Sequence, residues 1–263
     1  MPIQPIIRKD CFWLNRRREN AGMTARMRVC VFSSTLQTRF KDMEMGCCTT
    51  DGTDKMFSTH AARYARKFRK NGLDRAQRKI LKELEIAGLQ GKSILEVGCG
   101  VGGLHLTLLK KGAGSAVGID LSQGMIEEAK KLAREYGVDE RASYTQGDLV
   151  TGNGNIHARD IVILDKVLCC YADPEMLVEI SAAKAGELYA VSYPRDSWLA
   201  AAGFTCIQWI GTALRWSFHP YYHHPGWLDR LITQQEMQEI GAGTTPIWQI
   251  KLFRRVGAMG GKV

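Results

Sequence analysis

Proline and cysteine are scarce in this sequence. Only 7 of the 263 residues are proline and 8 are cysteine. A secreted disulfide scaffold contains about 8–10% cysteine, so the sequence excludes that class and favours a reducing compartment. Because 45% of the residues are apolar and 24% are charged, the chain can bury a large core and is not a disordered chain. We expect one large α/β domain with a terminal extension.

Targeting signals and membrane-length apolar runs are also missing. No apolar stretch follows the basic start of the chain, so a secretory signal is not predicted. Residues 198–214 carry no charge and reach the lower limit of about 17 residues for a membrane span. They include Gly203, Gln208 and Gly211, which favour packing over a sheet. We therefore predict no transmembrane segment and a cytoplasmic location.

The net charge of +9 lies in the first third of the chain. Lys and Arg outnumber Asp and Glu by 9 to 4 in residues 1–46 and by 9 to 3 in residues 57–89, whereas residues 90–263 carry 17 against 18. The global charge therefore does not imply a nucleic-acid partner, and we expect none. An RNA enzyme that uses the basic residues between 63 and 79 is kept as an alternative.

The chain divides into four predicted segments. Residues 1–46 have no apolar period and predict a basic, disordered extension. Residues 47–90 predict a pair of helices. Residues 91–256 predict the α/β domain, with an aromatic-rich insertion at about 197–230, and residues 257–263 a short tail. The oligomeric state is not predicted.

Two helices are expected before the α/β domain. The first has an apolar period from Phe57, with Ser58 as a candidate cap, and is ended by an Asn71-Gly72 pair. The second has Asp74 as its cap. After them, short apolar runs alternate with helical segments, which is typical of a parallel sheet wound with helices. The predicted strands are 93–97, 116–119, 142–145, 161–164, 188–192 and 247–256, and the predicted helices between them are 104–111, 123–136 and 174–184.

A glycine-rich loop follows the first predicted strand directly. Gly98, Gly100 and Gly103 fit the GxGxxG pattern of dinucleotide sites, while Gly98, Gly100 and Gly102 fit GxGxG. Glycine lets the backbone turn tightly and approach a ligand closely. Glu96 would repel a pyrophosphate but can hold an ammonium group. A cofactor that carries an amino acid therefore fits better than a nicotinamide dinucleotide.

Two further carboxylates stand at predicted strand ends. Asp120 follows Gly98 by 22 residues and can accept hydrogen bonds from both ribose hydroxyls of an adenosine, whichever cofactor is bound. Asp148 follows the third predicted strand and can accept from the exocyclic amine of adenine. Leu121 and Leu149 can flank the ring. The pattern predicts a nucleoside site at the carboxyl edge of the sheet.

Taken together, these motifs resemble the class I S-adenosylmethionine-dependent methyltransferases over roughly residues 57–256. The resemblance implies a Rossmann-like, seven-stranded sheet, mostly parallel with an antiparallel last strand and helices on both faces. It also implies that Glu96 binds the methionine ammonium, Asp120 the ribose and Asp148 the adenine, with Asp165 and Lys166 beside the methionine and the substrate mouth. The matching motifs are Glu96-x-Gly98-x-Gly100-x-Gly102, Gly118-Ile119-Asp120-Leu121-Ser122, Gly147-Asp148-Leu149, and Asp160 to Asp165 followed by Asp173-Pro174. The cofactor-binding residues so implied are Glu96, Gly98, Cys99, Gly100, Gly102, Asp120, Leu121, Asp148, Leu149, Asp165 and Lys166.

Within this class, segments 164–171 and 192–195 resemble small-molecule methyltransferases related to magnesium-protoporphyrin O-methyltransferase. The Asn-Pro-Pro-Tyr type of motif for nucleobase amines is absent after the fourth predicted strand. The expected function is transfer of a methyl group from S-adenosylmethionine to a small, hydrophobic or aromatic acceptor. The alternatives are a nicotinamide-dependent oxidoreductase and a noncatalytic cofactor-binding protein.

For the methyl acceptor, the sequence gives candidate catalytic residues but does not assign one. No metal is expected, because the vicinal Cys169 and Cys170 fit small apolar roles and the histidines near 219 have no CxxC or HExxH companion. Aromatic residues after 197 are expected to pack over the sheet, as a core or as the roof of a pocket. The roof candidates are Trp198, Phe204, Trp209 and Trp216, and the catalytic candidates are Asp165, Tyr193, Arg195 and His219.

Overall fold

The computed structural model describes residues 50–152, 156–171, 173–213 and 220–257. The chain divides after Gly46 into two units, and all of these residues belong to the second, Cys47–Val263. The extension predicted for residues 1–46, the candidates Trp216 and His219, and the tail beyond residue 257 lie outside the described residues.

One seven-stranded sheet organises the described residues, in the order β3-β2-β1-β4-β5-β7-β6. Each neighbouring pair from β3 to β5 is parallel, and β7 is antiparallel to both β5 and β6. This is the predicted sheet with its antiparallel last strand, and the fold class is confirmed. The strands are β1 (Ser93–Val97), β2 (Ser115–Asp120), β3 (Ala142–Gln146), β4 (Arg159–Asp165), β5 (Ala185–Pro194), β6 (Met237–Thr244) and β7 (Trp248–Arg255).

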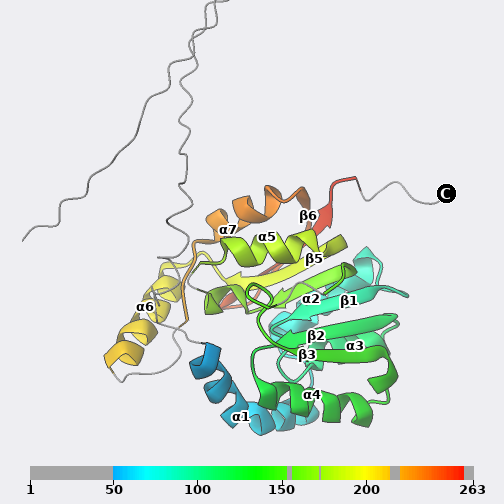
Figure 1. Cartoon of the computed structure of the whole chain (residues 1–263). Helices are drawn as coiled ribbons and strands as arrows, with labels where there is room; N and C mark the ends of the chain where they lie inside the picture. Colours follow the sequence, from blue (N-terminus) through cyan, green and yellow to red (C-terminus); the bar gives the residue numbers. More distant parts are fainter. Residues whose placement is uncertain (1–49, 153–155, 172, 214–219, 258–263) are drawn as a thin grey trace, which may run out of the picture. The chain divides into compact units, whose positions relative to one another are not determined.

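Helices cover both faces of the sheet, with α5 and α7 on one side and α4 on the other (Figure 1). Buried side chains of the first four helices join one apolar cluster, and those of α5 and α7 join a second. No helix among the described residues combines the length and the apolar character needed to cross a membrane. The helices are α1 (Thr50–Asn71), α2 (Arg75–Ala87), α3 (Gly103–Lys110), α4 (Gln123–Glu135), α5 (Glu175–Ala183), α6 (Trp198–Ala213) and α7 (Pro225–Thr233), with short 3-10 turns at Asp139–Arg141 and Leu168–Cys170.

Strand β4 separates the two apolar clusters. Ile161 and Ile163 face the first cluster, and Val162 and Leu164 face the second. All four side chains are fully buried. A central parallel strand is covered on both faces, so it reads as an unbroken apolar run rather than an alternating one. The sheet positions the carboxyl ends of β1, β2 and β4 level with each other, because Val97 pairs with both Ile119 and Leu164.

Two predictions for the ends of elements were wrong. Helix α1 begins at Thr50, before the expected Phe57, and Ser58 lies inside it. The Ser58 hydroxyl donates to Asp54 Oδ1 at 2.7 Å and lies 2.8 Å from Ser122 Oγ, so it does not cap the helix. The first turns of α1 escaped prediction because residues 50–56 show no apolar period.

Strand β6 was not located in the sequence. Of its eight residues only Met237 is buried, and it contains two glycines. An exposed edge strand with glycines lacks both the alternation and the side chains that mark a strand. The class of fold implied a seventh strand, but the local sequence did not show where it runs.

Asp74 caps α2, as predicted. Its Oδ1 accepts hydrogen bonds from the backbone N–H groups of Ala76 at 2.8 Å and Gln77 at 3.0 Å. The Gln77 side-chain oxygen accepts in return from the Asp74 N–H at 3.2 Å, which completes a capping box. The helix ends at Gly88, where φ is 108°.

Replacing this cap gives a prediction for stability. Asp74→Ala should lower the free energy of unfolding by about 1–2 kcal/mol, because the first turn of α2 loses its acceptor. Asp74→Asn is the matched control, since its amide oxygen can accept from the same N–H groups, and it should cost less. Urea unfolding of the two variants and the wild type measures both values, and equal losses would contradict the role as a cap.

The cost of Asp74→Ala should also depend on pH. Burial would raise the pKa of Asp74, but Lys166 and the backbone N–H groups of Gln77 and Ala76 lower it overall. A carboxylate with a depressed pKa stabilises the fold above its unfolded-state pKa, and this contribution is lost as the pH falls through the folded-state value. The difference between wild type and variant should stay constant above about pH 5 and shrink as the pH falls below about 4.

Candidate functional site

A cavity of about 500 Å³ opens at the carboxyl ends of β1, β2 and β4. The last residue of each strand lines it, namely Val97, Asp120 and Asp165. Strand order reverses at β1, which has β2 on one side and β4 on the other, and ligands of open α/β sheets bind at such switch points. Of the predicted cofactor residues, the cavity is lined by Glu96, Gly98, Cys99, Gly100, Asp120, Leu121, Leu149, Asp165 and Lys166, but not by Gly102 or Asp148.

The glycine loop after β1 turns tightly because three of its residues have positive φ. The values are 63° at Gly98, 53° at Gly100 and 79° at Gly102. A Cβ added to Gly98 would lie 2.5 Å from Val167 Cγ2, so the loop also packs closely against the segment that follows β4. Both constraints favour glycine at position 98, the first from conformation and the second from space.

Asp120 holds this loop from the neighbouring strand. Its Oδ2 accepts from the Gly100 N–H at 2.7 Å and its Oδ1 from the Ser122 N–H at 2.9 Å. Burial raises the pKa of the Asp120 carboxyl, although these two donors oppose the shift. Each carboxylate oxygen has a second lone pair. Asp120 can therefore accept ligand hydroxyls while it holds the loop.

Glu96 lies at the cavity wall and is held by the first turn of α3. Glu96 and His105 are both buried, with exposed fractions of 3% and 0%. His105 Nδ1 lies 2.5 Å from Glu96 Oε2, and the His105 backbone N–H donates to the same oxygen at 3.3 Å. On the other side of the ring, His105 Nε2 lies 3.0 Å from the Tyr144 hydroxyl. Sequence reasoning missed His105, because it falls within an apolar helical run.

Asp148 has partners within the protein. Its Oδ1 accepts from the Tyr171 hydroxyl at 2.5 Å and from the Val150 N–H at 2.9 Å. Burial and this hydrogen bond raise the pKa of Tyr171, which itself lines the cavity. The contact of Asp148 with adenine stays a prediction. Tyr171 is the cavity residue that Asp148 positions directly.

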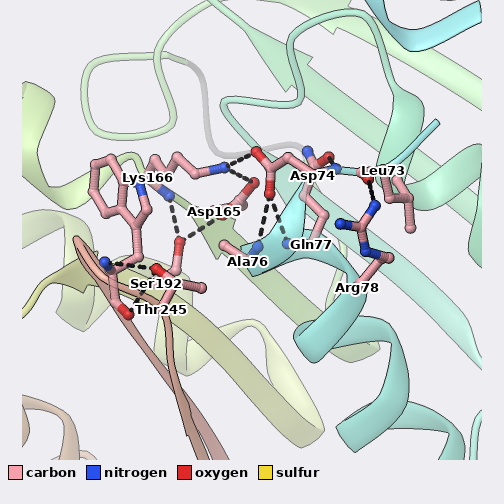
Figure 2. Close-up of polar contacts among 10 residues, drawn as sticks. Leu73, Asp74, Ala76, Gln77, Arg78, Asp165, Lys166, Ser192 and Thr245 are labelled. Atoms are coloured by element: carbon pink, nitrogen blue, oxygen red, sulfur yellow. Dashed lines mark hydrogen bonds and ion pairs between the residues drawn. The ribbon is translucent and has the colours of Figure 1, made fainter. Parts of the chain in front are cut away.

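Lys166 forms a polar cluster at the wall of the cavity (Figure 2). Its Nζ lies 2.7 Å from Asp74 Oδ2 and 3.1 Å from Asp165 Oδ2, and 5.8 Å from the centre of the Trp248 ring. Ser192 donates its hydroxyl to Asp165 Oδ1 at 2.5 Å and accepts from the Lys166 N–H at 2.9 Å. Burial alone would lower the pKa of Lys166, but Asp165 and Asp74 raise it overall. The side chain is therefore a fixed cation at neutral pH.

The backbone at Lys166 is strained. Its φ is 62°, a conformation that residues with a Cβ rarely adopt. Such outliers persist where the surroundings hold them, often at ligand sites. Here the backbone N–H is fixed by Ser192 and the side chain by two carboxylates. From the sequence, Lys166 was predicted as a site residue only through the family resemblance, which places it after the fourth strand.

Tyr193 and Arg195, two of the predicted catalytic residues, are not among the described residues that line the cavity. Tyr193 is fully buried, donates its hydroxyl to Asp229 Oδ1 and belongs to the second apolar cluster. Burial and this carboxylate raise the pKa of Tyr193. The Arg195 guanidinium donates to the Thr245 carbonyl at 3.4 Å. His219 lies outside the described residues.

Apolar side chains form much of the remaining cavity wall. Phe204 and Ile207 of α6 line it, and Phe204 packs edge-on against Trp248 with ring centroids 6.5 Å apart. Trp209 does not roof the cavity as expected, because it is 76% exposed and absent from the lining. Tyr64 and Lys67 of α1 also line the cavity.

The glycine loop gives a paired prediction. Gly98→Ala should lower the free energy of unfolding more than Gly100→Ala. Both introduce left-handed strain of about 1–2 kcal/mol, but only a Cβ at residue 98 meets a neighbour, while nothing lies within 4 Å of one at residue 100. The overlap should add about 1–3 kcal/mol. Urea unfolding checks the order, and equal losses would contradict the close approach to Val167.

Comparison with known sequences shows that part of the chain resembles a known domain. Residues 94–184 match the family model described as a methyltransferase domain. Ribosomal protein L11 methyltransferase of Neisseria gonorrhoeae is 35% identical over 95 residues, which is 35% of this chain and 32% of that protein. The protein of the same name from Klebsiella pneumoniae (strain 342) is 41% identical over 61 residues, 23% of this chain and 21% of that protein. The chain thus spans at most about a third of these curated relatives.

Solved structures share the fold over a longer stretch. Magnesium protoporphyrin IX methyltransferase of Synechocystis PCC 6803, solved with bound S-adenosylhomocysteine (SAH), has a TM-score of 0.62 at 22% identity and covers 78% of this chain and 99% of that chain. An O-methyltransferase family protein of Burkholderia thailandensis has a TM-score of 0.61 at 12% identity, covering 84% of this chain and 69% of that chain. At these identities the likeness shows the fold alone. Residues 94–184 thus resemble a methyltransferase domain in sequence, and the chain shares its fold with solved methyltransferases, in agreement with the motifs.

Proposed function

We propose that the protein transfers a methyl group from S-adenosylmethionine to a small, apolar or aromatic acceptor. The observation that carries this proposal is the pair of carboxylates, Glu96 and Asp120, at the wall of one cavity beside the glycine loop. Asp120 would accept the ribose hydroxyls and Glu96 the ammonium of the methionine part. We keep the cytoplasm as the proposed compartment.

The first turn of α3 argues against the nicotinamide alternative. In dinucleotide sites the pyrophosphate binds at the N–H groups of the helix that follows the glycine loop. Here the N–H of His105, in the first turn of α3, donates to Glu96 Oε2. A carboxylate of the protein therefore occupies the position that favours a phosphate, and a second anion would be repelled.

The cavity wall supports an apolar or aromatic acceptor with an oxygen atom. Beyond the glycine loop the lining includes Phe57, Phe204 and Trp248, which can cover a flat apolar molecule. Lys166 is a cation in the same wall, with its charge fixed by two carboxylates. It can donate a hydrogen bond to an acceptor oxygen and so orient that oxygen.

Methyl transfer from a sulfonium is an in-line displacement that depends on alignment. S-adenosylmethionine, when bound, supplies an activated methyl group. The chain has to hold the acceptor atom about 3 Å from that methyl and keep water away. Lys166 would orient the acceptor, and the aromatic side chains would exclude water. Asp165 would fix Lys166 rather than act as a base, because Ser192 and Lys166 already contact its two oxygens.

Calorimetric titration with SAH tests the cofactor, with NADH as the comparator. We expect micromolar binding of SAH alone, which is about −8 kcal/mol. Asp120→Ala should weaken that binding by about 1.5–3 kcal/mol, the scale of hydrogen bonds to a charged group. Asp139→Ala, at an exposed position, is the matched control. Binding of NADH but not of SAH by the folded protein would overturn the proposal.

Lys166→Met tests the acceptor side. We expect SAH affinity within about twofold of wild type and methyl transfer reduced by about tenfold or more, because one oriented hydrogen bond is lost. Magnesium protoporphyrin IX, which the similar Synechocystis enzyme is named for, and simple phenols are the first acceptors to assay with labelled S-adenosylmethionine. Lys131→Met, at an exposed position of α4, is the control. SAH binding without transfer to any acceptor in a broad extract would favour the noncatalytic alternative.

A further inference from the structure

We propose that His105 is a positioning residue, which sets the orientation of Glu96 for the amino-acid part of the cofactor. The inference rests on the proposed function. It is drawn from the buried chain Glu96–His105–Tyr144, in which the histidine lies between the carboxylate at the cavity wall and a tyrosine of β3.

The two oxygens of Glu96 have different surroundings. Oε2 contacts both the ring Nδ1 and the backbone N–H of His105. Among the residues that the structure describes, no hydrogen-bond partner is recorded for Oε1, and Glu96 lines the cavity. A buried carboxylate needs donors to stay ionised. His105 supplies them on one side, which leaves the other oxygen for a cationic ligand group.

Glu96 sets the tautomer of the histidine, and Tyr144 pairs with the other ring nitrogen. A neutral imidazole carries one donor and one acceptor nitrogen. Because Glu96 Oε2 is an acceptor, Nδ1 carries the hydrogen, and Nε2 then accepts from the Tyr144 hydroxyl at 3.0 Å. This arrangement satisfies every polar atom of the ring and gives the carboxylate one orientation.

The surroundings of position 105 favour an apolar side chain, so a histidine there calls for a specific role. The neighbouring positions 104, 106, 108 and 109 of α3 are all buried leucines. The ring also packs against the glycine loop, since a Cβ at Gly102 would lie 2.9 Å from His105 Cε1 and Nε2. Histidine at 105 therefore connects the loop, the carboxylate and β3, which an apolar side chain could not do.

Two ligands separate this role from a structural one. SAH carries the amino-acid part, whereas 5′-methylthioadenosine has the same adenosine and sulfur without it. We expect His105→Leu to weaken SAH binding by about tenfold or more and 5′-methylthioadenosine binding by less than about twofold. His60→Leu, at an exposed position of α1, is the matched control and should change neither.

A double-mutant cycle tests whether His105 acts through Glu96. In the Glu96→Gln background, His105→Leu should change SAH affinity by less than about twofold, because the group it orients has lost its charge. If His105→Leu does not fold, Tyr144→Phe takes its place. Tyr144 is one hydrogen bond further from Glu96 than His105 is, and it is only partly buried. Tyr144→Phe should weaken SAH binding by about threefold and leave 5′-methylthioadenosine binding unchanged.

The outcomes distinguish the positioning role of His105 from the proposed function. Equal weakening of both ligands by His105→Leu or Tyr144→Phe, or independent effects of His105→Leu and Glu96→Gln, would overturn the positioning role. Failure of the folded wild type to bind either ligand would instead overturn the proposed function. Selective loss of SAH binding in the variants, with an intact wild type, supports both.

Discussion

The hydrogen bond from the Gly100 N–H to Asp120 Oδ2 is the contact on which the site depends. It joins the loop after β1 to the end of β2, so the residues that follow the two strands share one wall of the cavity. The same loop reaches the segment after β4, where Gly98 lies against Val167. The loop can make both contacts because it takes positive φ and carries no side chain at Gly98.

Charges around the cavity are anchored by the protein before any ligand arrives. Asp120 accepts from two backbone N–H groups, and Glu96 contacts His105. Lys166 lies between Asp74 and Asp165, which ties the start of α2 to the end of β4. Anchored carboxylates cost less reorganisation when a ligand binds than free ones do. In our account this preorganisation, with the aromatic wall, supports binding of a charged cofactor beside an apolar acceptor.

Much of the fold was predictable from the sequence, because unbroken apolar runs such as 161–164 mark central parallel strands and the glycine loop marks the first strand-to-helix turn. The edge strand β6 was not, since its side chains are exposed. Glu96 and Asp120 were found because carboxylates next to strand ends stand out. His105 and Trp248 were missed because their partners are distant in sequence, and Tyr193 was included because a strand end does not show which face a side chain takes. Local sequence does not show that Tyr64, Asp74 and Phe204 meet at the cavity, because this depends on tertiary packing, such as that of α1 on α4 and of α2 on β7.

The most direct measurement is an experimental structure of the protein with SAH bound. Our account predicts the ribose hydroxyls on Asp120, the ammonium within hydrogen-bond distance of Glu96 Oε1, and the sulfur facing the side of the cavity that holds Lys166 and Trp248. Adenosine bound elsewhere, or an ammonium that contacts neither oxygen of Glu96, would contradict it.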